Sequence, residues 1–251
     1  MIVTFDLFSA MTNSRAGGSQ TLAKLARSRG WEYTGQVLYD RWDAHNKVGQ
    51  RTATAPTTFH DLSLRALRQT YVDFGLDISK ANEDMVALEN SVSEWPLWPD
   101  IADAVREIAE HTRVGLLSNV DDRLARRTRA FRLIEPALAL TSQRLGAFKP
   151  NPEIYQAAVA AVAPEKLVHI AASARDVRGA LEAGITTVRL ARPGHNLDGE
   201  GPKPPLEVDD AADLPGCSRG CETTSPTAQT KSPASRPTWA WSLGPIFLGP
   251  R

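Results

Sequence analysis

The stretch that decides the fold is MIVTFDLFSAMTNS, residues 1–14, in which four apolar or β-branched residues run directly into a carboxylate. The run IVTF at 2–5 predicts a short strand that is buried on both faces. The strand ends at Asp6, and the second residue after it is the aromatic Phe8. A charge at the end of a buried strand is costly unless something pairs with it, so Asp6 is the first candidate functional residue.

The rest of the chain predicts an α/β protein. Polar and small residues up to Gly17 and Gly18 predict a loop. Between residues 19 and 95, apolar residues recur every three to four positions, which predicts about four helices and no strand. From Trp98 onward, strand-like and helix-like segments alternate, which is typical of a parallel sheet with helices on both faces.

The expected strands after the first are 113–117, 138–142, 166–170 and 186–190, and the expected helices are 99–112, 121–133, 151–162 and 174–184. A helical block placed directly after the first strand indicates an insertion. The predicted organisation is a core of residues 1–18 and 96–215, a helical cap of residues 19–95, and a tail of residues 216–251. The tail is rich in Ser, Thr, Pro and Gly, which predicts disorder, although its apolar end could pack on the domain or on a partner.

Composition excludes several classes of function. Lys and Arg together number 29, as do Asp and Glu, so the formal net charge is zero and a nucleic-acid partner is not expected. The only cysteines, Cys217 and Cys221, lie in the tail and lack the further ligands of a zinc site. A core without disulfides, no signal peptide and no membrane-spanning run predict a cytoplasmic protein with no membrane partner.

Ligands of an open parallel sheet bind outside the carboxyl ends of its strands, so these ends predict the site. Asp6 follows the first strand, and Ser118 and Asn119 follow the second. Lys149 lies in the loop LGAFKPNP before a helix, and Ser173 and Asp176 follow the fourth strand. Each also has an ordinary structural explanation: Asp6 could cap a turn, Lys149 could be solvated, and the others could cap or stabilise helix starts. Tyr155, on the helix after Lys149, could equally well pack in the core.

The segments FDLFSAMT, LLSN, FKPNPEIY and AASARDVRGALEAG, in that order, resemble the four motifs of the haloacid dehalogenase superfamily. The resemblance covers about residues 1–195. It implies a Rossmann-like core with a cap that closes over the site. It also implies that Asp6 is a nucleophile, that Lys149 keeps it ionised, and that Asp176 positions a water molecule.

Phe8 separates two branches of this superfamily. The phosphatase branch usually has a second Asp at this position, which protonates the leaving group. It also usually has Gly-Asp where this chain has Ala171 and Ala172. A halide needs no proton to leave, so D-x-F and AASARD resemble the metal-independent L-2-haloacid dehalogenase branch. That branch implies a small 2-haloalkanoic acid as the substrate and no cofactor.

The remaining substrate-binding candidates follow from that branch. Ser118 and Asn119 would hold the substrate carboxylate or an oxyanion, and Arg41, on the second cap helix, would be the arginine that screens the site. Phe8, Tyr155 and Ser173 complete the set. The sequence departs from the branch at Arg175, where an aromatic residue is common, and at Ala10, where Thr is common.

Two alternatives remain open. One is a Mg²⁺-dependent phosphoester hydrolase in which Asp6, the Phe8 carbonyl and Asp176 would bind the metal. The other is a catalytically weak binding or regulatory protein of the same fold. A homodimer is possible, because dimers are common among similar proteins, but no feature of the sequence requires one.

Overall fold

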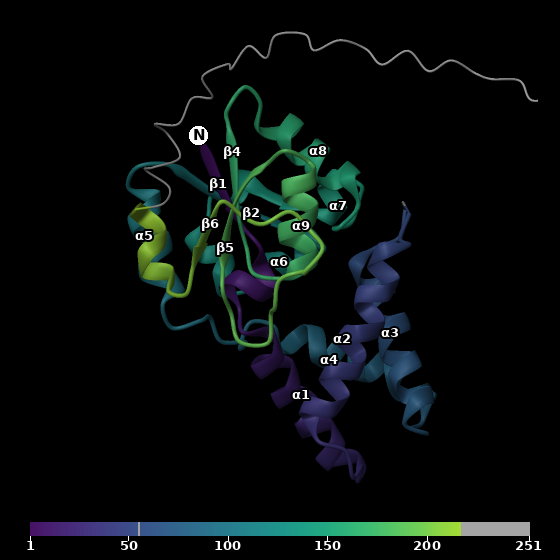
Figure 1. Ribbon diagram of the computed structural model, residues 1–251. Helices are drawn as coiled ribbons and strands as arrows, with labels where there is room; N and C mark the ends of the chain where they lie inside the picture. Colours follow the sequence, from purple (N-terminus) through teal and green to yellow (C-terminus); the bar gives the residue numbers. More distant parts are fainter. Residues whose placement is uncertain (55, 217–251) are drawn as a thin grey trace, which may run out of the picture.

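The computed structural model describes residues 1–54 and 56–216 and contains a six-stranded, all-parallel sheet (Figure 1). The strands are β1 (Ile2–Phe5), β2 (Arg113–Ser118), β3 (Ala139–Thr141), β4 (Leu167–Ala171), β5 (Thr186–Leu190) and β6 (Leu206–Val208). Their order in the sheet is β3-β2-β1-β4-β5-β6. The chain therefore steps to one side of β1 first and to the other side afterwards. This reversal opens a crevice at the carboxyl ends of β1 and its neighbours.

Helices cover both faces of the sheet, so the predicted Rossmann-like α/β core is confirmed. Helix α5 (Ile101–Ala109) lies on one face, and α8 (Pro152–Val162) and α9 (Ala174–Glu182) lie on the other (Figure 1). All four residues of β1 are buried, as expected for a strand covered on both sides. Two short helices, α6 (Asp122–Ala125) and α7 (Ser142–Leu145), connect the strands near the site.

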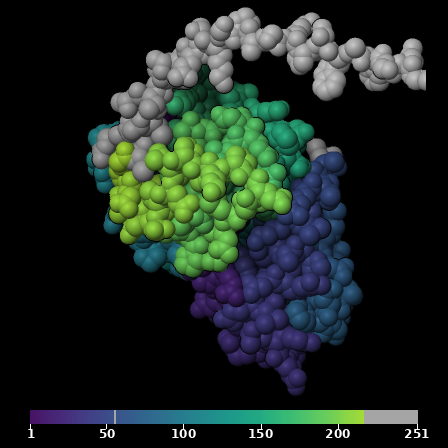
Figure 2. All heavy atoms as spheres, in the orientation of Figure 1, coloured from purple at the N-terminus to yellow at the C-terminus, as the bar shows by residue number. Residues whose placement is uncertain are grey.

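Between β1 and α5, the structure contains the four expected helices: α1 (Ser14–Arg29), α2 (Gly35–Arg51), α3 (Phe59–Asp73) and α4 (Ala81–Ser91). They pack together beside the sheet, and we call α1–α4 the helical block (Figures 1 and 2). Their caps explain the boundaries. The Thr34 and Thr58 side chains accept hydrogen bonds from the first turns of α2 and α3, and Gly30 ends α1 in a left-handed conformation.

The predicted loop at Gly17 and Gly18 is wrong, because both residues lie inside α1. The helix begins early because the Asn13 side chain accepts from the Ala16 backbone N–H at 3.1 Å. A Cβ atom at Gly17 would lie 2.3 Å from the ring of Trp95. The glycines therefore serve close packing of the helical block and do not mark a turn.

The structure corrects one further prediction and adds a strand that was not predicted. The segment 121–133 is not one helix, because only α6 and a 3₁₀ turn at Ala130–Leu133 are helical. The sequence analysis also missed β6, which pairs with β5 in a register that places Leu206 beside Val188. Strand β6 has only three residues and is partly exposed at the sheet edge, so it lacks the apolar signal of a buried strand.

The two chain segments that join the helical block to the core are themselves joined side by side. Thr12 and Leu97 form an antiparallel bridge, and the Asn13 N–H donates to the Pro96 carbonyl at 2.9 Å. The Trp98 N–H donates to the Met11 carbonyl at 3.0 Å. The chain thus enters and leaves the helical block through two short segments that are hydrogen-bonded to each other.

Across residues 1–54 and 56–216, no helix has the length and apolar character needed to cross a bilayer. The predicted disordered tail and both cysteines fall almost entirely on residues 217–251, outside the described part of the chain.

Candidate active site

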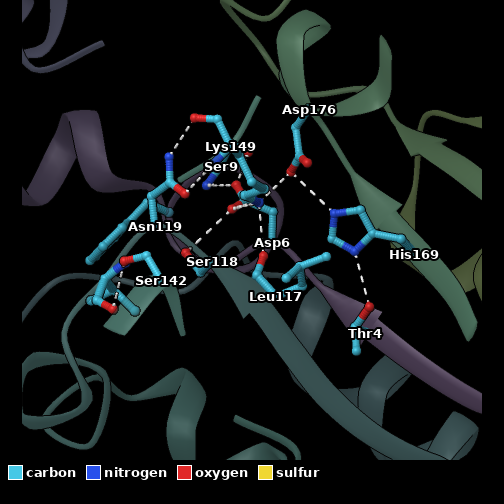
Figure 3. A network of polar contacts seen from close by, with 12 residues as sticks. Thr4, Asp6, Ser9, Leu117, Ser118, Asn119, Ser142, Lys149, His169 and Asp176 are labelled. Carbon is cyan, nitrogen blue, oxygen red and sulfur yellow. Dashed lines mark hydrogen bonds and ion pairs between the residues drawn. The ribbon is translucent and has the colours of Figure 1, made fainter. Parts of the chain in front are cut away.

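Four polar side chains that lie far apart in the sequence meet at the carboxyl edge of the sheet (Figure 3). Asp6 directly follows β1, and Ser118 is the last residue of β2. Lys149 comes from the loop before α8, and Asp176 lies in the first turn of α9. The structure therefore brings together the residues that the strand-end argument selected.

The Lys149 ammonium lies between the two carboxylates. Its Nζ donates to Asp6 Oδ1 at 2.8 Å, to Asp176 Oδ2 at 2.5 Å and to the Leu117 carbonyl at 2.8 Å. All three side chains are buried, so little of the ion pairs is exposed to bulk water. The three N–H donors of the ammonium are all used, and one cation offsets two anions in a low-dielectric environment.

Asp6 is held from its other side by Ser9. The Ser9 backbone N–H donates to Asp6 Oδ2 at 3.0 Å, and the Ser9 hydroxyl donates to the same oxygen. Ser9 is positioned by a π-helical turn at Leu7–Met11, and the Asp6 side chain caps this turn. Burial alone would raise the pKa of Asp6, but the Lys149 ammonium outweighs it and the pKa lies below the ordinary value.

Asp176 accepts hydrogen bonds from three side chains. Besides Lys149, the Tyr155 hydroxyl donates to Asp176 Oδ1 at 2.9 Å, and His169 Nε2 lies 3.2 Å from Asp176 Oδ2. His169 Nδ1 in turn lies 3.1 Å from the Thr4 hydroxyl. Burial would raise the pKa of Asp176, but Lys149 and then His169 lower it below its usual range.

The sequence analysis missed both Ser9 and His169. His169 lies in β4 opposite Thr4 of β1 and is fully buried. Its only sequence signal is that one polar residue interrupts each of two apolar strands, IVTF and LVHIA. Ser9 gave no distinguishing signal, because the turn that positions it is not periodic.

The structure places Tyr155 behind Asp176 and not in the wall of the cavity. The Tyr155 side chain is fully buried, and its ring packs so closely on α9 that a Cβ at Gly179 would lie 2.7 Å from it. Its hydroxyl is used by Asp176. Tyr155 is thus placed to fix the acid and not to touch a substrate.

Asn119 lies in the cavity wall, but its amide is already engaged. Its Nδ2 donates to the Lys149 carbonyl at 2.8 Å and to Gln50 Oε1 at 2.9 Å, and its Oδ1 accepts from the Lys149 N–H at 2.7 Å. These bonds clamp the backbone of Lys149. Ser118, whose hydroxyl lies 3.4 Å from Asp6 Oδ1, also lines the cavity, as does Ser173 at the start of α9.

A cavity of about 1000 Å³ separates this sheet edge from the helical block. Its polar end contains Asp6, Ser118, Lys149 and Asp176. The helical block lines the opposite side with both polar and apolar side chains, and the aromatic residues that line the cavity are Phe8, Tyr39, Trp42, Phe59, Trp95 and Trp98. The Phe8 ring stacks on Phe59 with the ring centroids 6.0 Å apart and lies 5.9 Å from Trp95.

The structure does not bring Arg41 to this cavity. Its guanidinium is about half exposed, pairs with Asp73 of α3, and is not among the lining side chains. The cavity instead contains Arg175, which donates to Gln50 Oε1 at 2.6 Å. Arg175 is one of the residues at which the sequence departs from the dehalogenase pattern.

The donor set predicted for Mg²⁺ does not fit the ion well. All four carboxylate oxygens of Asp6 and Asp176 already accept hydrogen bonds from Lys149, Ser9, Ser118, Tyr155 or His169. The Phe8 carbonyl accepts from the Ser14 hydroxyl at 2.6 Å. Mg²⁺ needs octahedral oxygen ligands with free lone pairs, and here Lys149 occupies the space between the two acids.

The lowered pKa of Asp6 predicts the acid side of a pH profile. We expect Asp6 to remain ionised below pH 3.8, the ordinary value of an aspartate. Any rate that depends on this carboxylate should therefore show no acid limb above about pH 5, over the range in which the protein stays folded. Fixed-time assays of turnover from pH 4 to 8 measure this pH dependence, and a rate that halves near pH 6 would contradict the prediction.

A family model described as haloacid dehalogenase-like hydrolase matches residues 1–184. No curated protein matches the chain.

Among solved structures, the chain resembles L-2-haloacid dehalogenase from Xanthobacter autotrophicus with chloropropionic acid covalently bound. The identity is 19%, the TM-score is 0.72, and the match covers 87% of this chain and 98% of that one. The defluorinating L-2-haloacid dehalogenase Rha0230 has 23% identity and a TM-score of 0.74, with 87% and 94% covered. The HAD-hydrolase YfnB from Bacillus subtilis, bound to magnesium, has 14% identity and a TM-score of 0.68, with 86% and 97% covered. At these identities, the likeness shows a shared fold.

Proposed function

The chain belongs to the haloacid dehalogenase-like hydrolase family, and from that premise we propose that it removes halide hydrolytically from a 2-haloalkanoic acid. The observation that carries the proposal is the buried Asp6–Lys149–Asp176 arrangement beside Phe8. It provides an ionised nucleophile and no neighbouring acid at the position of Phe8. A halide leaves as the anion of a strong acid, so dehalogenation does not require an acid at the position of Phe8 to protonate the leaving group.

In the first step, a carboxylate oxygen of Asp6 attacks the halogen-bearing carbon from the side opposite the halogen. The new C–O bond forms as the carbon–halogen bond breaks, and the bonding pair leaves with the halide. The product is an ester between the Asp6 side chain and the substrate carbon. Lys149 favours this step because it keeps Asp6 ionised and fixes its orientation.

In the second step, water attacks the Asp6 carbonyl carbon and hydrolyses the ester. Asp176 takes one proton from this water as the C–O bond to the carbonyl carbon forms. The ester C–O bond then breaks, and the alkoxide takes that proton from Asp176 and leaves as the 2-hydroxy acid. The second proton of the water goes to solvent. Lys149 and the Ser9 N–H lie beside the Asp6 oxygens, where negative charge develops in the tetrahedral intermediate. The Asp6 carboxylate is restored with one oxygen from water.

The helical block would act as the cap of this site, because its residues line the cavity on the side opposite the sheet edge. Ser118 and Ser173 remain our candidates for contact with substrate. With a net charge of zero and a cavity suited to small molecules, we propose a cytoplasmic enzyme without a nucleic-acid partner.

One pair of assays separates the candidate functions. Purified protein is incubated with a series of 2-bromoalkanoates and with p-nitrophenyl phosphate, each with EDTA or with Mg²⁺. We expect bromide release that EDTA does not reduce. Phosphate release that requires Mg²⁺ would support the phosphoester hydrolase, the second candidate. Inactivity on both substrates would favour a binding protein.

A further inference from the structure

Arg175 differs from the other basic side chains of the cavity in its partners. Lys149 pairs with Asp6 and Asp176, Lys47 with Asp43, and Arg15 with Asp40. The Arg175 guanidinium contacts only neutral oxygens, Gln50 Oε1 at 2.6 Å and the Lys47 carbonyl at 3.5 Å. Among the described residues, no carboxylate lies within ion-pair distance of it.

The Arg175 side chain is partly buried, and a cation that loses hydration without gaining a close counter-ion is destabilised. Burial accordingly lowers the pKa of Arg175, although the more distant Asp43 and Asp176 act against this effect. A guanidinium has five N–H donors, and the two contacts leave others available for a planar anion. The group is also fixed, because Gln50 Oε1 accepts from Asn119 as well as from Arg175.

The cavity is also larger and more aromatic than a short acid requires. Its volume of about 1000 Å³ lies at the upper end of the range for sites that enclose drug-sized ligands, roughly 300–1,000 Å³. A three-carbon haloacid would leave most of it filled with water. The Phe8, Phe59 and Trp95 rings form a continuous apolar surface against which a longer chain or an aryl group could pack.

From these observations we propose that the substrate is a 2-halo acid with a bulky apolar substituent, whose carboxylate binds Arg175 and whose substituent packs on the aromatic wall. This rests on the proposed function and adds the substrate class and a specificity residue. Arg175 would meet the substrate carboxylate, a role that the sequence analysis gave to Ser118 and Asn119, and it follows Ser173 closely on the same helix as Asp176. The carboxylate would thus be held near the acid that positions water.

The first test compares 2-bromopropionate, 2-bromohexanoate and 2-bromo-3-phenylpropionate by bromide release. Each buried methylene favours transfer from water, so kcat/KM should rise about 10- to 50-fold from the propionate to the hexanoate. A preference for 2-bromopropionate would overturn this inference and leave the proposed function intact. No bromide release from any of the three would overturn both.

The second test asks whether Arg175 binds the carboxylate. In Arg175→Gln, KM for 2-bromohexanoate should rise about 100-fold, with kcat changed less than about 5-fold, because a charge-assisted contact to the bound acid is lost. The ratio of kcat/KM for 2-bromohexanoate to that for 2-bromohexanamide should fall toward one. Arg175→Lys should recover part of the lost affinity.

Arg178→Gln is the matched control, because Arg178 lies on the same helix and pairs at the surface with Glu182 and Asp198. It should leave both kinetic constants unchanged. Calorimetric binding of 2-bromohexanoate to Asp6→Asn, with and without Arg175→Gln, gives the same comparison without turnover. Equal affinities in the two proteins, or an unchanged selectivity for acid over amide, would overturn the role of Arg175.

Discussion

Replacing Asp6 by Asn should reduce halide release by about 10⁴-fold or more, because the covalent step needs an ionised oxygen that an amide does not provide. The amide keeps the size of the carboxyl group, and its one oxygen can still accept from Lys149 or from Ser9. The fold should therefore survive, and circular dichroism checks this. A control is Asp103→Asn, which removes an exposed carboxylate of α5 that pairs only with Arg106 at the surface.

Isotope labelling tests the same residue without a mutation. After several turnovers in ¹⁸O-water, mass spectrometry of the peptide containing Asp6 should show incorporated ¹⁸O, because hydrolysis of the ester leaves one water oxygen in the side chain. If the label appeared only in the hydroxy acid, water would be attacking the substrate directly. Asp6 would then not be the nucleophile.

Replacing Lys149 by Met should lower the free energy of unfolding at pH 7 by about 3–5 kcal/mol, in addition to abolishing turnover. The change leaves two buried carboxylates, Asp6 and Asp176, without the cation between them. Like charges that are close together in a buried site destabilise the fold strongly. Urea unfolding measures the loss, and Lys24→Met, at an exposed site, should cost less than about 0.5 kcal/mol.

The pH dependence of this loss distinguishes charge from packing. In the natural protein both carboxylates have lowered pKa values, so their contribution to stability is present above about pH 3.8 and is lost as the pH falls through those lowered values. Without Lys149 their pKa values should rise, and protonation would relieve the repulsion. The difference between the two proteins should therefore shrink from pH 7 toward pH 5. A difference that stays constant would indicate a packing defect.

The sequence predicted the sheet and the convergence of Asp6, Ser118, Lys149 and Asp176 because both follow from chain order. Buried parallel strands read as apolar runs, and their ends must meet at one edge of the sheet. The details of the neighbouring contacts do not enter that argument. The loop at Gly17 was wrong for a related reason, because the packing of Trp95 on α1 is a tertiary contact that local composition does not record.

Arg41 is a candidate site residue that this reasoning placed wrongly. The α2 residues that line the cavity recur with helical spacing and so form one face of the helix. They are Gln36, Tyr39, Asp40, Trp42, Asp43, Ala44, Asn46, Lys47 and Gln50. Arg41 lies beside this face, next to Asp73 of α3. Periodicity shows that a helix has two faces, but only the packing of α2 against α3 shows which face turns toward the sheet. The sequence analysis named Arg175 only as a departure from the dehalogenase pattern, although its place beside Asp176 follows from the end of the fourth strand.

The bridge between Thr12 and Leu97 also restricts how the molecule can change shape. Two crossing segments tied side by side behave as a single pivot, so the α1–α4 assembly can rotate about that point but has little freedom to slide along the sheet edge. Rotation away from the sheet would have to separate Gln50 from Asn119 and the start of α3 from Asp121, whose carboxylate accepts from the Phe59 and His60 N–H groups at 2.9 Å. Opening the cavity to solutes would therefore break a contact of Asn119, whose amide also holds the backbone of Lys149.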